Sequence, residues 1–359
     1  MESGLKKRWV IVLFGSGVLI CVLANSITIP YKLQQYINYQ WACLTKQTES
    51  WVCLSHHGID EINISGLTGD LWGVSNEIMF HFPSNSQQGF GKTQIINVEK
   101  VGEFPFYSGF CANDKIWLIN SEKINDEHVP AFYSYDPDTG VYSHPLLPEN
   151  LPKVVSQWYC FSSDKGELVF WNTYDIGIYD GASWQSLSFE LADGEYILAV
   201  KEDRHGNLWA FTLNGRLLRR SSATQEWSQH AQIDLGDKDW SWFMLLDIDL
   251  NDEYLWVVYQ DEFYRFPLNQ HTGQLELIYK NPEYSLFSKV YVDELSNNIW
   301  VIFDKNIITV DSQSLKAVPF PIPTQDGYNN INDIVVDPTT RRLYIATTYG
   351  VYYLDIQSD

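Results

Sequence analysis

Basic residues are scarce in this sequence. Its 359 residues include 24 Lys and Arg against 45 Asp and Glu, which gives a formal net charge of -21 at pH 7. A field of that sign repels phosphate backbones and anionic lipid headgroups. We therefore expect no nucleic-acid partner, whereas a neutral or cationic ligand, or a protein with a basic patch, fits the charge.

Motifs that mark common catalytic and cofactor sites are missing. The sequence contains no H-E-x-x-H, C-x-x-C, G-x-S-x-G or G-x-G-x-x-G pattern. Residues 91–93 imitate the end of a phosphate-binding loop, but Ser86 stands where the first Gly is needed. Residues 247–251 resemble the start of a calcium loop, yet Asp252 takes the place of the Gly that makes its bend. We expect no metal and no cofactor.

Helix signals are nearly absent after residue 35, whereas aromatic residues are abundant. The chain has 14 Trp and 22 Tyr, and flat rings pack well on pleated sheets. A hydrophobic fraction of 45% is enough for a sizeable core. All-β folds commonly exceed about 200 residues as one body, so we expect one all-β domain over residues 58–359.

The first thirty residues differ from the rest of the chain. Lys6, Lys7 and Arg8 precede an uncharged run of 23 residues from Trp9 to Tyr31. As a helix, this run would cross a hydrocarbon core of about 30 Å. We interpret residues 1–30 as a signal anchor, with a cleaved signal peptide as the alternative. The basic residues place the N-terminus in the cytoplasm and the remaining chain outside, and a cleaved chain would be secreted.

Only five cysteines are present, and the expected export allows them to pair. Cys43 and Cys53 end two similar tripeptides, Trp41-Ala42-Cys43 and Trp51-Val52-Cys53. Their pairing is the first choice among the three possible pairings of the four exported cysteines. Cys111 and Cys160 lie in apolar, strand-like runs. We interpret these two as buried thiols, because free cysteine behaves as a small hydrophobe.

A repeated doublet organises the chain. An apolar pair, usually ending in Trp, follows a polar turn at intervals of 40 to 52 residues. The copies are Leu71-Trp72, Ile116-Trp117, Leu168-Val169, Leu208-Trp209, Leu255-Trp256, Ile299-Trp300 and Leu343-Tyr344. This period is typical of a four-stranded propeller blade. The sequence thus predicts a single β-propeller of seven four-stranded blades, preceded by an N-terminal membrane-anchor helix.

An acidic residue stands before several of these doublets. Asp249, Asp293 and Asp337 lie six residues before theirs, and Asp203 lies five before Leu208. A recurring Asp is best explained by the turn itself, since its carboxylate accepts hydrogen bonds from backbone N–H groups just ahead of it. We do not expect these acids to be catalytic. The doublet is expected to pack between neighbouring blades.

The seventh copy stops after its third strand. We expect the missing outer strand to come from residues 31–57, a stalk and closing strand, in which residues 37–41 have suitable alternation. Such closure would pair the last open sheet edge.

Residues 202–209, EDRHGNLW, resemble the two-component regulator propeller repeat, whose pattern runs acid, Asp, x, x, Gly, Asn, Leu, Trp. Other copies keep mainly the Asp and the doublet, and copies two and three have lost most of the pattern. The resemblance implies a propeller with an extracytoplasmic sensing role that binds saccharides or a partner. No kinase, cyclase or DNA-binding segment follows copy seven, so we expect any signal to pass through another protein.

Blade geometry sorts the loops onto two faces. Turns between second and third strands, together with the connections between blades, share the face on which propellers usually bind. Aromatic and acidic side chains, which suit sugars and cations, recur in these loops. The candidate ligand-binding residues are Trp240, Trp242, Asp237, Asp239, Tyr174, Asp175, Tyr259, Asp261, Tyr284, Asp304, Tyr328 and Tyr349. We expect a non-catalytic module that binds a saccharide or a protein. The alternative is a hydrolase or lyase acting on a polysaccharide or peptide.

Overall fold

The computed structural model divides the chain into two compact units, Met1–Thr45 and Lys46–Asp359. The residues that it describes are 10–14, 17–21, 52–55, 61–64, 70–75, 78–83, 94–97, 109–112, 115–124, 127–143, 158–163, 165–187, 189–238, 240, 246–283, 285, 288–293, 296–303, 305–320, 331–337, 340–347 and 350–356.

The described part of the first unit is a hairpin in which β1 (Val10–Phe14) pairs antiparallel with β2 (Gly17–Cys21). The sequence predicted a membrane-anchor helix here, so the structure differs from that expectation. Val and Ile are β-branched and favour strands, and a short apolar run alone does not separate strand from helix. Among the described residues, no helix has the length and apolar character needed to span a membrane.

Every regular element described in the second unit is a strand, and the strands form the following sheets. Sheet 1 contains β4 (Glu61–Ile64), β5 (Leu71–Ser75), β6 (Ile78–Phe82) and β7 (Gln94–Asn97). Sheet 2 contains β8 (Gly109–Ala112), β9 (Ile116–Ile124), β10 (Glu127–Asp136) and β11 (Val141–Ser143). Sheet 3 contains β12 (Tyr159–Ser162), β13 (Leu168–Trp171), β14 (Ile176–Tyr179) and β15 (Trp184–Leu187).

Sheet 4 contains β16 (Ile197–Glu202), β17 (Leu208–Thr212), β18 (Arg216–Arg220), β19 (Trp227–Asp234) and an added strand, β23 (Thr272–Gln274). Sheet 5 contains β20 (Leu246–Leu250), β21 (Tyr254–Tyr259), β22 (Glu262–Pro267) and β24 (Glu276–Lys280). Sheet 6 contains β25 (Ser288–Asp293), β26 (Asn298–Phe303), β27 (Asn306–Asp311) and β28 (Ala317–Phe320). Sheet 7 contains β29 (Ile331–Asp337), β30 (Arg342–Thr347), β31 (Gly350–Asp355) and β3 (Val52–Ser55).

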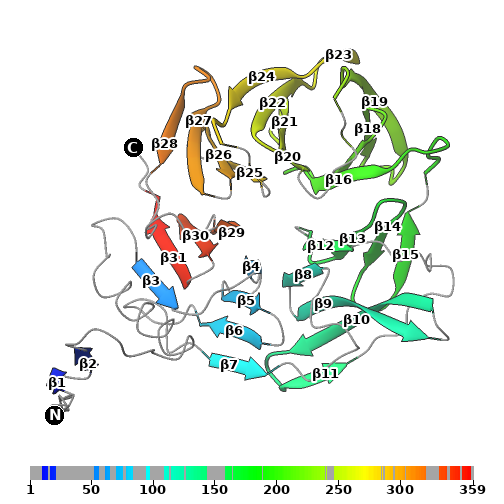
Figure 1. The fold of residues 1–359 in the computed structure, drawn as a ribbon. Coiled ribbons are helices and arrows are strands. Elements are labelled where there is room, and N and C mark those ends of the chain that lie inside the picture. Colours follow the sequence, from blue (N-terminus) through cyan, green and yellow to red (C-terminus); the bar gives the residue numbers. More distant parts are fainter. Residues whose placement is uncertain are drawn as a thin grey trace, which may run out of the picture. The chain divides into compact units, whose positions relative to one another are not determined.

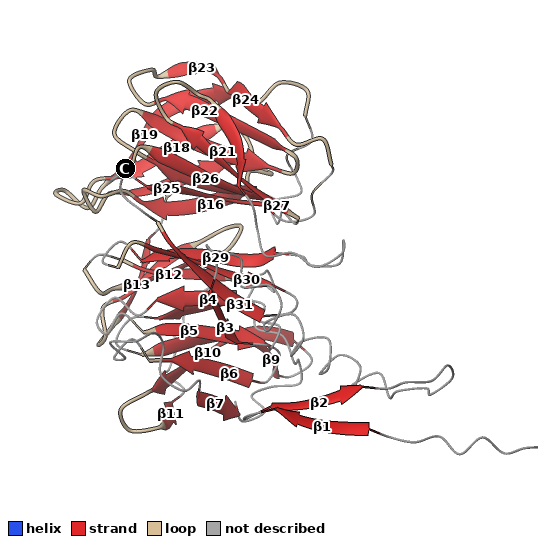
Figure 2. Ribbon diagram, turned by 90° about the vertical axis from the view of Figure 1, so that its left-hand side faces the viewer, coloured by secondary structure: helices blue, strands red, loops and turns tan. Residues whose placement is uncertain are grey.

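These sheets lie around a ring, with the first strand of each toward its centre (Figure 1). The first strands of neighbouring sheets contact each other. The contacting pairs are β4 with β8, β8 with β12, β16 with β20, β20 with β25, β25 with β29, and β29 with β4. Between sheets 3 and 4, the backbone N–H of Ile197 donates to the carbonyl oxygen of Thr173 at 2.8 Å. Figure 2 shows only strands and loops among the described residues. The prediction of an all-β propeller is confirmed.

The doublets pack between neighbouring sheets, as expected from the sequence. The second residue of each doublet shares a core cluster with residues of the following sheet: Trp72 with Ile116, Trp117 with Leu168, Val169 with Val200, Trp209 with Ile248, Trp256 with Val290, Trp300 with Ile334, and Tyr344 with Leu71. The last pair joins sheet 7 to sheet 1. Full burial of the aliphatic side chains that pack against them, such as Ile116 and Ile248, stabilises the fold by about 1.5–3 kcal/mol each.

The outer strand of sheet 7 comes from the N-terminal side of the second unit. In its ladder Val52 faces Tyr353, and β3 runs antiparallel to β31. A segment from the other end of the ring therefore supplies the missing strand, but the assignment of this role to residues 37–41 is wrong. Alternating residues recur in several short segments, so alternation could not select the right one. Residues 37–41 themselves lie outside the described part.

The recurring acids are structural, though not all in the way the sequence suggested. Asp203 accepts hydrogen bonds from the backbone N–H groups of His205 and Asn207, each at 2.9 Å, and from Trp209 Nε1 at 2.7 Å. This is the predicted turn role. Asp249 differs, because its Oδ2 accepts from the backbone N–H of Val292 in sheet 6 at 2.8 Å and so ties two sheets together.

The structure corrects one cysteine assignment. Cys160 in β12 is disulfide-bonded, so its interpretation as a free thiol is wrong. A cysteine in an apolar run can be either a thiol or half of a disulfide, because the choice depends on which strands become neighbours. The proposed partners Cys43 and Cys53 remain a prediction, since residue 43 lies outside the described part.

Candidate functional site

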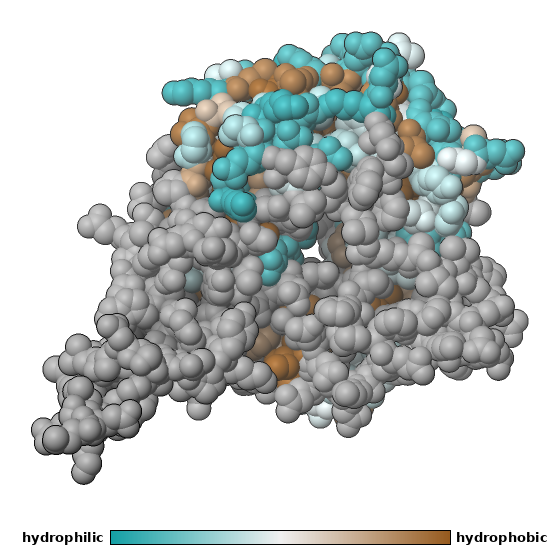
Figure 3. All heavy atoms as spheres, viewed as in Figure 1, coloured by the Kyte–Doolittle hydropathy of each residue, from teal (hydrophilic) through white to brown (hydrophobic). Residues whose placement is uncertain are grey.

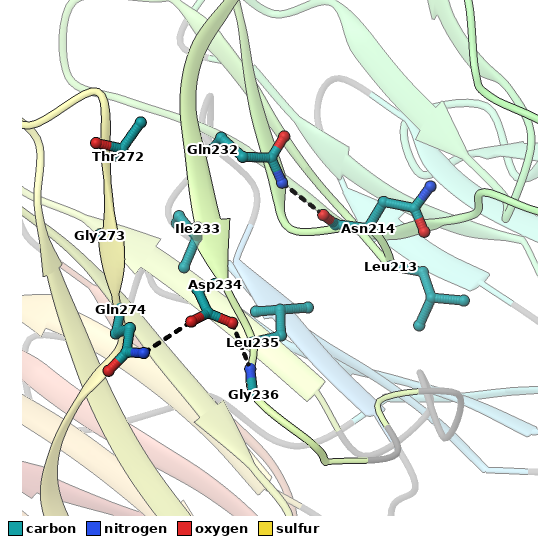
Figure 4. Close-up of a pocket in the computed structure, with 10 residues that line it drawn as sticks. All are labelled: Leu213, Asn214, Gln232, Ile233, Asp234, Leu235, Gly236, Thr272, Gly273 and Gln274. Carbon is teal, nitrogen blue, oxygen red and sulfur yellow. Dashed lines mark hydrogen bonds between the residues drawn. The ribbon is translucent and has the colours of Figure 1, made fainter.

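A groove lies where sheets 4 and 5 meet, on the face that carries the connections between sheets. It has a volume of about 590 Å³. Figure 4 shows the residues that line it. Its lining comes from the turn after β17, from the end of β19 and the residues that follow it, and from β23: Leu213, Asn214, Gln232, Ile233, Asp234, Leu235, Gly236, Thr272, Gly273 and Gln274. Figure 3 shows hydrophilic and hydrophobic residues side by side over the region of these two sheets.

The pairing of β23 with β19 builds one wall of this groove. β23 lies in the connection between β22 and β24 of sheet 5, yet it pairs parallel with the outermost strand of sheet 4, where Ile233 faces Gly273. The backbone N–H of Gln232 donates to the carbonyl oxygen of His271 at 2.8 Å. Pairing in this way covers the edge of β19, which would otherwise expose unpaired backbone groups.

The opposite wall depends on the Asn214-Gly215 turn. Gly215 has a φ of +75°, a left-handed conformation that glycine adopts without strain. A Cβ built on Gly215 would lie 2.0 Å from the carbonyl oxygen of Ile233, so no larger residue fits. Gln232 Nε2 donates to the carbonyl oxygen of Asn214 at 2.7 Å and holds the turn against β19.

Asp234 is the one titratable side chain among the ten lining residues. It accepts hydrogen bonds from Gln274 Nε2 at 2.7 Å and from the backbone N–H of Gly236 at 3.0 Å (Figure 4). These bonds, that from Gln274 first, hold the pKa of Asp234 below its usual value. The groove therefore offers one ionised carboxylate among side-chain amides, a hydroxyl and exposed backbone.

A cluster of charged residues follows the groove along the same face. We call Lys238, Glu262, Tyr264 and Lys280 the lysine cluster. Lys238 pairs with Glu262 and Tyr264, Tyr264 donates to Glu262, and Lys280 Nζ lies 2.9 Å from Glu262 Oε1. Burial raises the pKa of Tyr264 to about 12, with the charge of Asp261 adding to the effect. Tyr264 therefore keeps its proton and remains a hydrogen-bond donor.

The structure places two of the predicted aromatic residues in the core. Trp240 is 3% exposed and stacks on Tyr259, which is also 3% exposed, with ring centroids 4.5 Å apart. Trp240 Nε1 donates to the carbonyl oxygen of Leu235 at 3.2 Å. Neither ring presents a face to a ligand in this structure, so their burial does not support the prediction that Trp240 and Tyr259 bind a ligand. Trp240 instead packs against Tyr264 of the lysine cluster, with ring centroids 5.9 Å apart.

The other predicted site residues are dispersed. Asp237 is exposed beside the groove, and Asp261 lies 3.5 Å from Lys280 Nζ. Tyr174 and Asp175 lie together at the turn before β14, where Tyr174 is 42% exposed and burial raises the pKa of Asp175. The remaining candidates fall outside the described residues: Trp242, Asp239, Tyr284, Asp304, Tyr328 and Tyr349.

Sequence reasoning missed the groove and most of the lysine cluster. The available signal was the length of the polar segment between β22 and β24, which leaves room for β23. A short parallel pairing with a strand of another sheet has no local pattern, so the sequence did not predict it. The sequence also did not predict that Lys238 and Lys280 would meet at one glutamate, because the contact of Lys238 with Glu262 depends on the packing of sheet 5 against the segment that follows β19.

No protein-family model and no curated protein sequence matches this chain. Its structure is similar to that of YCF48 from Cyanidioschyzon merolae, with a TM-score of 0.59 and 15% identity over 85% of this chain and 98% of that chain. A structure of YCF48 bound to D1 peptide has a TM-score of 0.55 at 12% identity, over 87% of this chain and 98% of that chain. The extracellular domain of the two component system BT4673 from B. thetaiotaomicron has a TM-score of 0.55 at 13% identity, over 84% of this chain and 42% of that chain.

These likenesses define the class of fold. At identities of 12 to 15% they support a β-propeller and nothing more specific. An extracellular two-component domain is among the similar structures, in agreement with the propeller implied by residues 202–209, but no family model confirms that particular repeat.

Proposed function

We propose that this chain is a non-catalytic binding module, a membrane-anchored extracytoplasmic propeller of seven blades that holds a protein segment in the groove lined by the turn after β17, the end of β19 and β23. The groove carries the proposal, because it presents amide, hydroxyl and backbone groups around one carboxylate. Such a lining recognises a neutral or basic peptide through hydrogen bonds. Among proteins of similar structure, YCF48 binds a peptide, which supports this class of partner.

The lining argues against the alternative of a hydrolase or lyase at this place. General acid–base catalysis needs an acid and a base whose pKa values are matched to the reaction. Asp234 is the one titratable lining residue, and its lowered pKa keeps it ionised. A single ionised carboxylate binds a ligand but supplies no acid.

The proposed location rests on the sequence. Three basic residues, Lys6 to Arg8, followed by the uncharged run to Tyr31 favour an anchored chain with its propeller outside, although the β1–β2 hairpin within this run does not supply the spanning helix. Extraction of membranes with alkaline carbonate tests the anchor. An anchored chain stays with the lipid, whereas release into the supernatant would contradict anchoring without touching the binding proposal.

A variant that fills the groove tests the binding function. Thr272 is exposed on β23, so Thr272→Trp should block the groove without disturbing the core. The matched control is Val318→Trp, at a residue 44% exposed on the outer strand β28 of sheet 6. The full-length proteins are immobilised, and the exported proteins that each retains are quantified by mass spectrometry.

We expect the wild type and Val318→Trp to retain the same partner, and Thr272→Trp to lose at least about 90% of it, as an order-of-magnitude drop in affinity predicts. Equal retention by all three proteins would show that the groove is not the binding site. Melting temperatures of the variants exclude loss of fold as the cause.

A further inference from the structure

A second pocket lies between sheets 4 and 5 on the opposite face, beside the turn of residues 202–209. Its volume is about 400 Å³, and its lining includes Trp209, Arg219, His230, Arg204, His205 and Asp252. The turns after β16 and β20 both contribute, so the pocket exists only where the two sheets meet.

Arg219 carries the positive charge of this pocket. It faces Trp209 across the β17–β18 ladder, and its guanidinium carbon lies 5.5 Å from the centre of the indole ring. Its Nε is buried and has no hydrogen-bond partner among the residues that the structure describes. Stacking on Trp209 fixes the group but does not neutralise it.

The other arginines show how unusual Arg219 is. Within the described ranges, five of the seven arginines form ion pairs with carboxylates: Arg204, Arg216, Arg265, Arg341 and Arg342. Arg220 has the charge of Glu167 nearby. Arg219 has no acidic partner in this part of the chain, although acids outnumber bases by 45 to 24 in the whole sequence. A cation left unpaired in such a chain points to a partner from outside.

The two acids of the pocket are already engaged. Asp203 is bound by His205, Asn207 and Trp209, and Asp252 pairs with Arg204 and with His205 Nε2 at 3.0 Å. His230 Nε2 lies 2.7 Å from the carbonyl oxygen of Leu268, and burial lowers the pKa of His230, so this ring is neutral near pH 7. Arg219 is therefore the free charge.

The charges select the class of ligand. The two acids and two arginines of the lining balance each other, so a bound carboxylate would leave a formal charge of -1 and a dianion such as phosphate -2. A carboxylate paired with Arg219 is therefore repelled less than phosphate. Trp209 is already engaged by the Arg219 guanidinium over its ring and by His230 at an interplanar angle of 79°, with centroids 4.9 Å apart, which makes it a poor stacking surface for a sugar. At physiological ionic strength the Debye length is about 8 Å, so the more distant acids of the protein are largely screened.

We propose that this pocket binds the carboxylate of an acidic side chain on a partner protein, with Arg219 as its ion-pair partner. The site goes beyond the groove of the proposed function, because it lies on the other face and takes a ligand of opposite charge. Arginine presents two parallel N–H donors to a planar carboxylate, which gives a strong and directional pair.

Peptide titration against the full-length protein tests this site. The probes are a short blocked peptide with a central glutamate and the same peptide with glutamine in its place. Isothermal titration calorimetry at physiological ionic strength measures the affinity of each peptide. We expect the glutamate peptide to bind at least about tenfold more tightly than the glutamine peptide, the size of one charge-assisted pair. Equal affinities would overturn the proposal, and so would displacement of the peptide by an equal concentration of inorganic phosphate.

Three substitutions sharpen the test. Arg219→Gln should abolish the preference for glutamate, whereas the matched control Arg265→Gln should keep it, because Arg265 also lies over a ring, that of Tyr254, but is paired with Glu276 at 2.7 Å. Asp252→Asn removes the competing carboxylate and should tighten binding by about threefold or more.

If Arg219→Gln does not fold, Arg219→Lys takes its place, with a several-fold weaker preference expected. An unchanged preference in the Arg219 variant would overturn the site, as would weaker binding by Asp252→Asn. None of these outcomes depends on the groove.

Discussion

Asp203 holds a turn together through its charge. Its carboxylate accepts from two backbone N–H groups, from Asn207 Nδ2 at 3.0 and 2.9 Å, and from the indole of Trp209. Burial raises the pKa of Asp203, but the hydrogen bonds from Trp209 and Asn207 outweigh it, so the pKa lies below its usual value. The ionised form is thus the one that the fold stabilises.

Replacing Asp203 by Asn should destabilise the fold in a pH-dependent way. An amide cannot accept all of these donors, so we expect a loss of about 1.5–3 kcal/mol in unfolding free energy at pH 6. Because the folded pKa lies below the unfolded value of about 3.9, the contribution is complete above that value and disappears as the pH falls through the folded pKa. Urea denaturation at pH 6 and pH 3 should show that the difference in unfolding free energy between the wild type and Asp203→Asn is smaller at the lower pH.

The control for this measurement is Asp237→Asn. Asp237 is exposed and makes no hydrogen bond to other described residues, so its replacement should change stability by less than about 0.5 kcal/mol. A gap of equal size at both pH values for the Asp203 variant would contradict the role assigned to its charge.

At the scale of elements, two sheet edges are covered by segments from elsewhere. β23 covers β19, and β3 covers β31. Both additions protect backbone groups that would otherwise pair with other chains. The first also builds the groove, so edge protection and ligand binding share one strand.

Removing β3 should weaken the second unit more than removing the residues before it. Deletion of residues 1–56 takes β3 away, whereas deletion of residues 1–50 leaves it in place. We expect the longer deletion to lower the melting temperature by about 5 °C or more relative to the shorter one, because β31 then becomes an open edge. Circular dichroism melts of the two truncated proteins measure the difference. Identical melts would mean that β3 contributes nothing to closure.

The sequence predicted elements where a periodic signal existed. The doublets at Trp209 and Trp256 recur at blade spacing, so both the propeller and the packing of these rings between sheets could be predicted. β23 and Trp240 lie outside that period. The pairing of β23 and the burial of Trp240 depend on contacts between sheets 4 and 5, which no local pattern records.

At the scale of the whole molecule, the net charge and the ion pairs have opposite effects on how salt changes the stability of the fold. A net charge of -21 produces self-repulsion that is strongest at low ionic strength. Pairs such as Arg341 with Asp293, at 2.6 Å, join neighbouring sheets and are weakened by salt. Because acids exceed bases so strongly, we expect repulsion to dominate.

Salt should therefore stabilise the fold. Between low and physiological ionic strength we expect the melting temperature of the full chain to rise by about 3 °C as repulsion is screened. Sodium chloride and choline chloride should give the same rise, which separates screening from binding of a particular cation. A lower melting temperature in salt would show that the ion pairs outweigh the net charge.

The pairing of β3 with β31 also determines when the ring can be completed during synthesis. β3 emerges long before β31, so its partner is missing until nearly all of the second unit has been made. Contacts so distant in sequence form slowly, and a growing chain exposes unpaired edges in the meantime. Until β31 is synthesised, β3 is therefore the segment of the nascent chain with the greatest need of a chaperone. A nascent chain stalled before β31 should be the form most readily degraded.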